Sequence, residues 1–347
     1  MRIPPTIPAG GDRGGRFRPR RPARWGAAAV ITALALLLAA CTGSSGSAGP
    51  AAQSTATSAA AAPAASSSSV AAVRSPYTKV LVIAEENETY DQVLGGTHAP
   101  YLIGLARTYG SATAMFAGDA VSCPSLPSYL IMTSGDRFGI CDDNDPSSHP
   151  ISAANVFQQV AVSGRQWRDY AESMPAPCLR TDSPDGLYAV RHAPASYYVT
   201  EAGRCPQWDI PMGTPTLGAL HDDITAGTLP AYGFVSPNVC DDMHGGPGCA
   251  ASVATGDTWL RQWIPTLMAG SDYRSGRLAI VITWDEGSDA SNHTPLVVIS
   301  PTTQHLSVTQ PLTLCSVLRG VEDILHLAPL GCAAQAKSVA TAFHLTS

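Results

Sequence analysis

The chain has 347 residues, of which 45% are apolar and 14% charged, and its formal net charge at pH 7 is −6. The apolar content is ample for a sizeable core, in one large domain or two small ones. An acidic chain gains nothing from its overall field when it meets nucleic acid or anionic lipid. We therefore expect no nucleic-acid partner.

The first 41 residues have the pattern of a secretory signal. Seven arginines precede an apolar run over residues 26–38, which is too short for a bilayer span of roughly 20 residues. The run leads into the tetrad LAAC, which resembles a bacterial lipobox. We therefore expect a lipoprotein signal peptide over 1–41, with Cys41 as the lipidated residue. The pair Arg20-Arg21 leaves both the general and the twin-arginine export route open.

Export changes the charge of the chain that remains. Residues 1–41 hold seven arginines and one aspartate, so the formal net charge of the rest is −12. We expect this part to be lipid-anchored at the outer face of the bacterial cell membrane, or shed from it. An anionic substrate would have to be held there by local cations, and this points to metal.

The cysteines after Cys41 are even in number, which suggests disulfides in an exported protein, and the absence of any C-x-x-C pair argues against zinc fingers. Sequential pairing is the simplest of the many connectivities, because each bond then closes a short loop. The expected pairs are Cys123–Cys141, Cys178–Cys205, Cys240–Cys249 and Cys315–Cys332.

Residues 42–75 are almost entirely Ala, Ser, Thr, Gly and Pro. Such a composition cannot bury enough apolar surface to offset the entropy lost when a chain is ordered. We therefore predict a disordered tether over 42–75 and a folded domain over 76–347.

From residue 77 onward, apolar runs of strand length alternate with helical patterns. Predicted strands are 79–85, 165–172, 231–237, 278–284 and 294–300, and predicted helices are 99–110, 151–164, 257–270 and a helix-like run at 129–133. This alternation predicts an α/β domain with a largely parallel central sheet. The Pro-, Gly- and Cys-rich stretch 173–215 is predicted to be a disulfide-pinned loop of the kind that lines a site.

Polar residues follow three of the predicted strands at the point where each strand ends. They are Glu86 and Asn87, then Asn238, Asp241, Asp242 and His244, and then Asp285, Glu286 and, a little later, His293. Each residue alone is more often a helix cap or a turn former. Together they offer hard oxygens and imidazole at one edge of the sheet, where ligands of open α/β sheets bind, so the pattern favours a metal site.

Ser125 lies in the stretch CPSLPSYLIMTSG, residues 123–135, just ahead of a predicted helix. A serine at a helix N-terminus is commonly its capping residue. The same position suits a nucleophile, because a metal would lower the pKa of the hydroxyl and the helix end favours a bound phosphate.

Several segments resemble the phosphoesterase family of bacterial acid phosphatases and phospholipases C. VIAEENETYDQVLG, residues 82–95, resembles its MENxSYDxxxG turn, and the Ser125 stretch resembles its HPSLPNYLALTSG. The segments WRDYAESMP, FVSPNVCDDMH, IVITWDEG and NHTPLVVISP match in the family's order. The resemblance covers roughly residues 78–330 and implies the three-layer αβα fold of the alkaline-phosphatase-like superfamily.

The resemblance implies a role for each matching residue. Those expected to hold a divalent metal are Glu86, Asn87, Ser125, Asp285 and Glu286. Those expected to face the phosphoryl group are Asn87, Asn238, Asp242, His244 and His293. Ser125 is the expected nucleophile, and His244 or His293 would bind a second metal or protonate the leaving oxygen. Oxygen ligands suit Mg²⁺, Ca²⁺ or Mn²⁺, and added histidines would admit Zn²⁺ or iron.

Three residues depart from the family's pattern. Glu85 replaces an apolar residue, and Cys123 replaces a histidine and would anchor the Ser125 loop if it is bonded to Cys141. Ser128 replaces an asparagine that can help to hold a phosphate oxygen, a difference that bears on the substrate preference.

The expected function is metal-dependent hydrolysis of a phosphate ester through a phosphoseryl intermediate, as in acid phosphatases. One alternative is a phospholipase C that acts on membrane phospholipids. The other is a non-catalytic surface-binding protein that kept the fold. No segment suggests an obligate protein partner.

Overall fold

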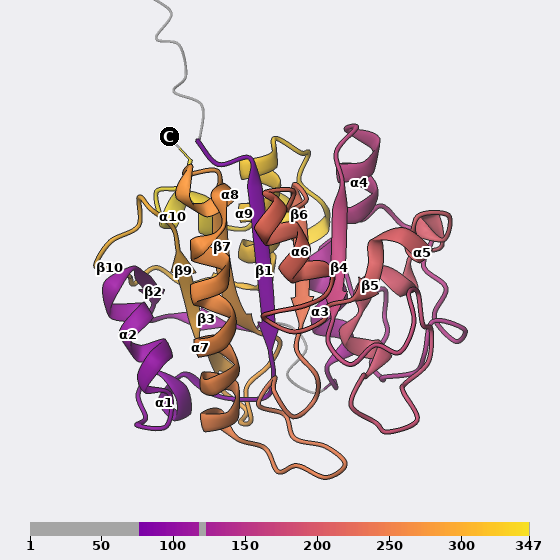
Figure 1. The fold of residues 1–347 in the computed structure, drawn as a ribbon, viewed down its shortest axis with the longest axis horizontal. Coiled ribbons are helices and arrows are strands. Elements are labelled where there is room, and N and C mark those ends of the chain that lie inside the picture. The colour runs from indigo at the N-terminus through magenta and orange to yellow at the C-terminus, as the bar shows by residue number, and fades with distance from the viewer. Residues whose placement is uncertain (1–75, 118–122, 347) are drawn as a thin grey trace, which may run out of the picture. The chain divides into compact units, whose positions relative to one another are not determined.

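An eight-stranded sheet forms the centre of the computed structural model, which describes residues 76–117 and 123–346 (Figure 1). The predicted signal peptide 1–41 with Cys41 and the predicted tether 42–75 lie outside these residues. The strands are β1 Lys79–Glu85, β2 Gly110–Ala112, β4 Trp167–Ala171, β5 Asp209–Pro211, β6 Tyr232–Ser236, β7 Leu278–Trp284, β9 Leu296–Ile299 and β10 Leu306–Val308. A small second sheet consists of β11 Leu312–Thr313, β3 Met115–Phe116 and β8 His293–Thr294.

The strand order in the large sheet is β10-β2-β9-β7-β1-β6-β4-β5. Strands β7, β1, β6, β4 and β5 are mutually parallel, whereas β9 runs antiparallel to both of its neighbours. The predicted α/β fold with a largely parallel central sheet is therefore confirmed. Because β1, β6 and β7 run in the same direction, the polar residues that follow them emerge at one edge of the sheet.

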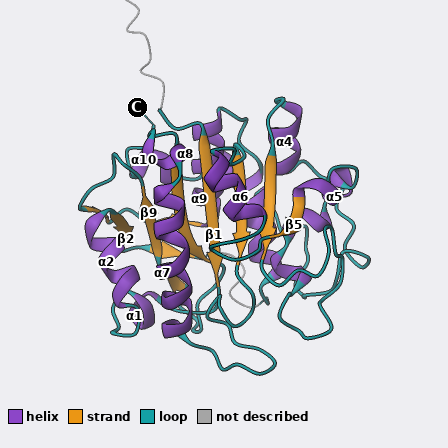
Figure 2. Ribbon diagram, in the orientation of Figure 1, coloured by secondary structure: helices purple, strands orange, loops and turns teal. Residues whose placement is uncertain are grey.

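Helices cover both faces of the large sheet, which gives three layers (Figure 2). The α-helices are α1 Tyr90–Val93, α2 Pro100–Thr108, α3 Leu126–Ser134, α4 Val156–Val162, α5 Cys205–Trp208, α6 Ala219–Ala226, α7 Val253–Ala269, α8 Ser271–Arg274, α9 Leu314–Leu325 and α10 Val339–Ala342. The 3₁₀ helices are η1 Val190–His192, η2 Pro194–Tyr197, η3 Val199–Glu201 and η4 Gly331–Ala334. Within the described residues, no helix is long and apolar enough to cross a bilayer.

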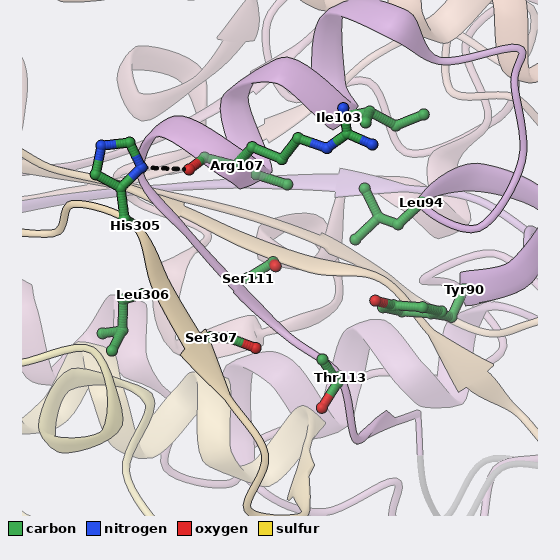
Figure 3. Close-up of a pocket in the computed structure, with 10 residues that line it drawn as sticks. Tyr90, Leu94, Ile103, Arg107, Ser111, Thr113, His305, Leu306 and Ser307 are labelled. Carbon is green, nitrogen blue, oxygen red and sulfur yellow. Dashed lines mark hydrogen bonds between the residues drawn. The ribbon is translucent and has the colours of Figure 1, made fainter.

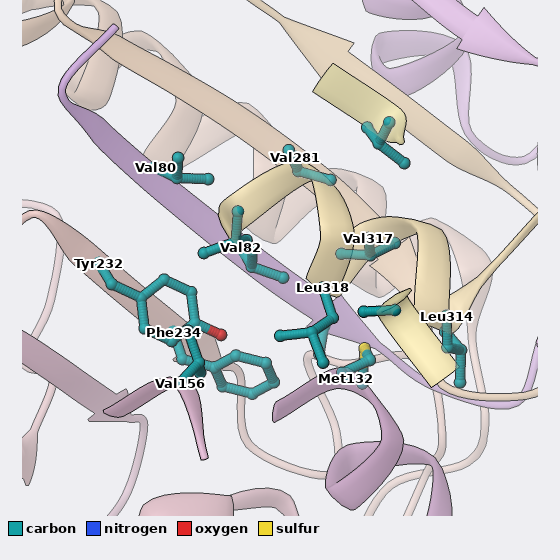
Figure 4. Packing of buried hydrophobic residues seen from close by; sticks show 14 of the residues in the cluster. Val80, Val82, Met132, Val156, Tyr232, Phe234, Val281, Leu314, Val317 and Leu318 are labelled. Atoms are coloured by element: carbon teal, nitrogen blue, oxygen red, sulfur yellow. The ribbon is translucent and has the colours of Figure 1, made fainter. Parts of the chain in front are cut away.

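The central strand β1 shows why the fold has three layers. Its side chains alternate, so that Val80 and Val82 belong to a core with α3, α4 and α9, and Leu81 and Ile83 to a core with α2, α6 and α7. Figure 4 shows Val82 facing Leu318 of α9. A strand that is buried on both faces reads as an unbroken apolar run, which is the pattern that predicted it.

The element boundaries follow local capping. The helix predicted over 151–164 starts only at Val156, because the Asn155 side chain accepts a hydrogen bond from the backbone of Gln158 and caps it there. The helix predicted over 257–270 starts earlier, at Val253, because Ser252 caps it in the same way.

All four predicted disulfides are present: Cys123–Cys141, Cys178–Cys205, Cys240–Cys249 and Cys315–Cys332. The second closes most of the predicted loop, which contains the 3₁₀ helices η1, η2 and η3 and also the short helix α5 and strand β5, neither of which was predicted. The described residues all belong to one compact unit, residues 68–347.

Two buried carboxyl groups lie opposite each other on β4 and β5, the last two strands of the large sheet. Asp169 on β4 is in register with Asp209 on β5. One oxygen of Asp169 accepts a hydrogen bond from the backbone of Ala195, 3.1 Å away, and its other oxygen has no partner among the described residues. Burial raises the pKa of Asp169 to about 8. Burial, and then the charge of Asp169, raises the pKa of Asp209 well above its usual range.

We predict that Asp169→Asn becomes more stable relative to wild type as the pH rises from about 4 to about 8. Above pH ~3.9 the unfolded chain has released the proton of Asp169, whereas the folded protein still keeps it. The wild type therefore loses free energy of unfolding as the pH rises through this range, and the variant, which has no such proton, does not. Urea unfolding at several pH values should show the difference growing by up to about 1.4 kcal/mol per pH unit. Asp222→Asn, at an exposed carboxylate of α6, is the control. Parallel stability curves for wild type and Asp169→Asn would show that the pair holds no such proton.

Candidate active site

Ser125 lies immediately before helix α3, in the position of its cap. Its backbone is already helical, and Pro127 in the first turn suits a helix start. Its hydroxyl makes no capping hydrogen bond, and instead donates to Oε2 of Glu86 at 3.0 Å. The capping interpretation of Ser125 therefore fails for its side chain. A buried serine hydroxyl directed onto a carboxylate is a pair suited to nucleophilic chemistry.

The far end of α3 is held in place by Gly135. This residue has φ of 73°, the left-handed conformation of a helix C-cap. A Cβ at this position would come within 2.5 Å of the carbonyl oxygen of Leu330, so only glycine fits here. At the near end, the bond between Cys123 and Cys141 anchors the loop before Ser125. The predicted role of Cys123 as a loop anchor is thus confirmed.

Glu86, the first residue after β1, is the centre of the site. Oε2 accepts from Ser125, and Oε1 accepts from the Tyr129 hydroxyl at 2.5 Å. Nε2 of His192 lies 3.2 Å from the same Oε1. Burial raises the pKa of Glu86 to about 7, although the hydrogen bond from Tyr129 and the charge of Arg191 oppose this rise. The carboxylate is poised close to neutral pH, as proton-transfer groups commonly are.

Asp242, in the turn after β6, faces Glu86 across His192. Nδ1 of His192 lies 3.4 Å from Oδ2 of Asp242, and the backbone of Glu86 donates to the backbone carbonyl of Asp242 at 2.8 Å. Burial, followed by the charge of Glu86, raises the pKa of Asp242 well above its usual range. Glu86, His192 and Asp242 each offer one ligand atom, and these atoms all lie within 4.8 Å of one another.

Asp285, after β7, lies beside the Glu86 turn. Its Oδ1 accepts from the backbone of Glu286 at 2.6 Å and from the backbone of Asn87 at 3.4 Å. Burial and then the charge of Glu86 raise the pKa of Asp285 well above its usual range. The same two causes raise the pKa of the half-buried Glu286 to about 7. The structure thus brings the loops of Glu86 and Asp285 together as the sequence predicted.

Two of the residues predicted to bind phosphate make contacts within their own loops and strands. The Asn238 side chain accepts from the backbone of Cys240 and donates to Asp241, which makes it a turn former. The His293 ring stacks on Tyr90 with centroids 4.8 Å apart, and its Nε2 contacts the carbonyl oxygen of Thr113.

His244 lies closer to the centre of the site. Its ring is edge-on to that of His192, with centroids 6.2 Å apart. Its Nδ1 contacts the carbonyl oxygen of Gly245 at 2.5 Å. Of the two predicted histidines, His244 is the one that the structure places against the Glu86 cluster.

His192 is a residue of the site that the sequence prediction missed. It lies in η1, inside the loop closed by Cys178–Cys205, and its ring stacks on Tyr129 with centroids 5.1 Å apart. Its carbonyl oxygen accepts from the Ser236 hydroxyl, which ties the loop to the end of β6. No local motif marks this histidine, and the only signal was the expectation that the loop lines a site.

The donor set of the site fits a divalent cation. Oδ2 of Asp242 and Oδ2 of Asp285 are buried and have no hydrogen-bond partner among the described residues. Buried carboxylates without a proton or a counter-charge are strongly disfavoured, and hard oxygens together with an imidazole suit Mg²⁺, Mn²⁺, Zn²⁺ or iron. The residues present therefore have both the vacant oxygens and the negative charge that a cation would satisfy.

A cavity of about 310 Å³ lies between α1, α2 and the strands β2 and β10. Figure 3 shows its wall, with Tyr90 and Thr113 at one end and Arg107 and His305 at the other. Tyr90 and Thr113 are the two residues that His293 contacts. None of the lining residues belongs to the Glu86 cluster, so the cavity is separate from the site.

Comparison of the sequence with those of known proteins finds enzymes that act on phosphate esters. The model of the Phosphoesterase family matches residues 96–328. The phosphatidylinositol-3-phosphatase of Mycobacterium tuberculosis is 26% identical over 264 residues, which are 76% of this chain and 82% of that protein. An acid phosphatase of Aspergillus fumigatus is 26% identical over 174 residues, 48% of this chain but only 36% of that protein.

Solved structures agree on the fold. A protein of the alkaline phosphatase superfamily from Vibrio parahaemolyticus aligns over 74% of this chain and 69% of its own, with a TM-score of 0.53 and 11% identity. The lipoteichoic acid synthase LtaP from Listeria monocytogenes aligns over 72% of each chain, with a TM-score of 0.50 and 9% identity. At such identities the likeness concerns the fold alone. It confirms the αβα architecture implied by the sequence motifs.

Proposed function

The chain belongs to the Phosphoesterase family, and on this premise we propose that it hydrolyses phosphate esters through a phosphoseryl intermediate on Ser125. Membership of the family confirms the predicted resemblance and the predicted enzyme class, a phosphoric ester hydrolase. The observation that carries the mechanism is the hydrogen bond from the buried Ser125 hydroxyl to Glu86.

In the first step, Oγ of Ser125 attacks phosphorus and the bond from phosphorus to the leaving oxygen breaks. The serine proton leaves along its hydrogen bond to Oε2 of Glu86. His244 is the proposed donor of the proton that the leaving oxygen takes up, because it lies against His192 at the centre of the site.

In the second step, water attacks the phosphoserine from the side that the leaving group has vacated. The bond between phosphorus and Oγ breaks, and the serine regains its proton from Glu86. The water proton passes to the histidine that served as the acid in the first step, which then again becomes an acid. The products are an alcohol and inorganic phosphate.

A divalent metal is part of this proposal. Glu86, Asp285 and Asp242 would hold it together with His192, in addition to the predicted Asn87, Ser125 and Glu286. A bound cation would supply positive charge for the phosphoryl oxygens and would favour the ionised serine. The side chains of the site carry an excess of negative charge. A positive charge is therefore needed there for an anionic substrate to bind.

A phosphomonoester is the proposed substrate class. The relative matched over most of its length and the fungal relatives are all named phosphatases, and none of them is named a phospholipase C. The name of the mycobacterial relative specifies a phosphoinositide, which makes a membrane-embedded monoester a candidate beside small soluble esters. The binding-protein alternative leaves unexplained why a serine is buried against Glu86.

We further propose that the protein acts outside the cell, lipid-anchored through Cys41. The four disulfides support an oxidising compartment. Radiolabelled palmitate incorporated by the wild type and lost in Cys41→Ser would support the anchor, and equal labelling of both would refute it.

Removal of divalent metal is expected to abolish hydrolysis of p-nitrophenyl phosphate, because the uncompensated carboxylates would then repel the substrate. EDTA treatment followed by dialysis should lower the rate at least about 100-fold, and one of Mg²⁺, Ca²⁺, Mn²⁺, Zn²⁺ or Fe²⁺ should restore it. Elemental analysis of the purified protein gives the metal content. Full activity in a protein shown to be metal-free would refute metal dependence.

A panel of monoesters, diesters and phospholipids separates a phosphatase from a phospholipase C.

A further inference from the structure

We propose that Arg191 binds the phosphoryl group of the substrate and favours a terminal phosphate, as found in a monoester, over a phosphodiester. This inference rests on the proposed hydrolysis at Ser125. Arg191 belongs to η1 and directly precedes His192. It matches no sequence motif noted above.

Two chains of contacts connect Arg191 with Ser125. On one side, Nε of Arg191 lies 3.4 Å from Oδ2 of Asp143, and Oδ1 of Asp143 accepts from the backbone of Leu126 at 3.0 Å. Leu126 is the residue after Ser125. On the other side, the neighbouring His192 contacts Glu86, which accepts from the Ser125 hydroxyl. The guanidinium is therefore linked through Asp143 to the start of helix α3.

The Arg191 guanidinium uses only part of its hydrogen-bonding capacity within the protein. Its Nε is buried and lies 3.4 Å from Oδ2 of Asp143 without forming a hydrogen bond, and within residues 76–117 and 123–346 no hydrogen bond from Nη1 or Nη2 is found. The side chain is 19% exposed, so a ligand can reach it. The other arginines of the same loop differ, since Arg180 donates to the carbonyl oxygen of Pro146 and Arg204 pairs with Glu201.

The charge of Arg191 acts on the centre of the site. After burial, it is the largest contribution of any charged side chain to the low pKa of His192. It also opposes the burial that raises the pKa values of Glu86 and Asp242. The carboxylates of Glu86, Asp242 and Asp285 repel an anionic substrate, and the positive charge of Arg191 acts on the first two.

The free edge of a guanidinium matches two phosphate oxygens at once. A terminal phosphate has three non-bridging oxygens and up to two negative charges, whereas a diester has two such oxygens and one charge. A bidentate contact to Nη1 and Nη2 leaves a terminal phosphate one further oxygen for the Glu86 centre, and leaves a diester none. Arg191 is therefore expected to contribute more to monoester hydrolysis than to diester hydrolysis.

The test compares wild type with Arg191→Gln in the metal-loaded, full-length protein. We expect kcat/KM for p-nitrophenyl phosphate to fall about 10- to 100-fold, the range for a lost hydrogen bond to a charged group. The dissociation constant for inorganic phosphate, measured by calorimetry, should rise at least about tenfold. Hydrolysis of bis(p-nitrophenyl) phosphate should change less than about threefold, or be absent in both proteins. Arg191→Lys keeps the positive charge but loses the paired Nη1 and Nη2 donors. Its kcat/KM and its phosphate affinity should lie between those of the wild type and of Arg191→Gln.

Arg180→Gln is the matched control, because it removes an arginine of the same loop whose contact is to Pro146. It should leave all three measurements unchanged. If Arg191→Gln does not fold, a fall of at least about threefold in monoester kcat/KM for Arg191→Lys supports the inference, and no fall overturns it. Equal losses for monoester and diester, or unchanged phosphate binding, overturn it while the proposed function stands. If the wild type hydrolyses neither ester, the proposed function fails, and phosphate binding alone decides the role of Arg191.

Discussion

Ser125→Ala is expected to abolish hydrolysis of an aryl phosphate, with kcat lowered by about 10³-fold or more. The substitution removes the atom that attacks phosphorus and leaves Glu86 without the hydroxyl that donates to Oε2. Metal content should stay near the wild-type value, because the carboxylates of Glu86 and Asp285 remain. Steady-state kinetics and elemental analysis on the same preparation measure both quantities.

The control for this prediction lies on the same helix. Ser134 is a buried serine of α3 whose hydroxyl donates to the carbonyl oxygen of Leu130. Ser134→Ala therefore removes a buried hydroxyl from α3 without touching Glu86, and should keep wild-type turnover. A trapped phosphoserine at Ser125, seen by mass spectrometry after an acid quench, would identify the intermediate directly. Wild-type turnover in Ser125→Ala would refute the nucleophile.

His192→Leu is expected to lower kcat, or the affinity for the metal, by about 10- to 100-fold. His192 lies between Glu86 and Asp242, 3.2 and 3.4 Å from the two carboxylates. Leucine would leave these buried carboxylates facing each other without a polar group between them, which favours protonation of one of them. The loss should show as a shift of the pH–rate profile as well as a fall in rate, a change that a purely structural defect would not cause.

Two further variants sharpen this prediction. His192→Gln keeps a hydrogen-bond donor in the same place and should recover part of the lost activity. His149→Leu removes another histidine that pairs with an aspartate, in this case the partly exposed Asp142, and should leave the kinetics unchanged. If His192→Leu turns over and binds metal like the wild type, the site does not depend on the imidazole.

Local patterns in the sequence were sufficient to predict the strands that lead to Glu86 and Asp285, and the disulfides. Apolar runs predicted β1 and β7, because strands covered by helices on both faces need no polar alternation. The parallel direction of these strands then placed Glu86 and Asp285 at one edge of the sheet. The disulfides followed from loop length, since cysteines near in sequence meet at little entropic cost.

The tertiary structure decided which side chains actually meet. The hydroxyl of Ser125 could have capped α3 or faced β1, and the choice depends on how α3 packs against the end of β1. Asn238 lies in the predicted turn and His293 begins strand β8, and their side chains contact Cys240 and Thr113 respectively. Their roles in phosphate binding remain predictions.

The sequence by itself therefore determined the αβα fold, the disulfide pairing and the turns that carry Glu86, Ser125 and Asp285. Only the tertiary structure showed that His192 lies between Glu86 and Asp242, with Arg191 next to it in the same 3₁₀ helix. Both lie in a loop without helical or strand periodicity, held by Cys178–Cys205 and by the Ser236 hydroxyl. Periodicity reports which face of an element is buried, but the direction of a loop side chain depends on contacts distant in sequence, which no local pattern encodes.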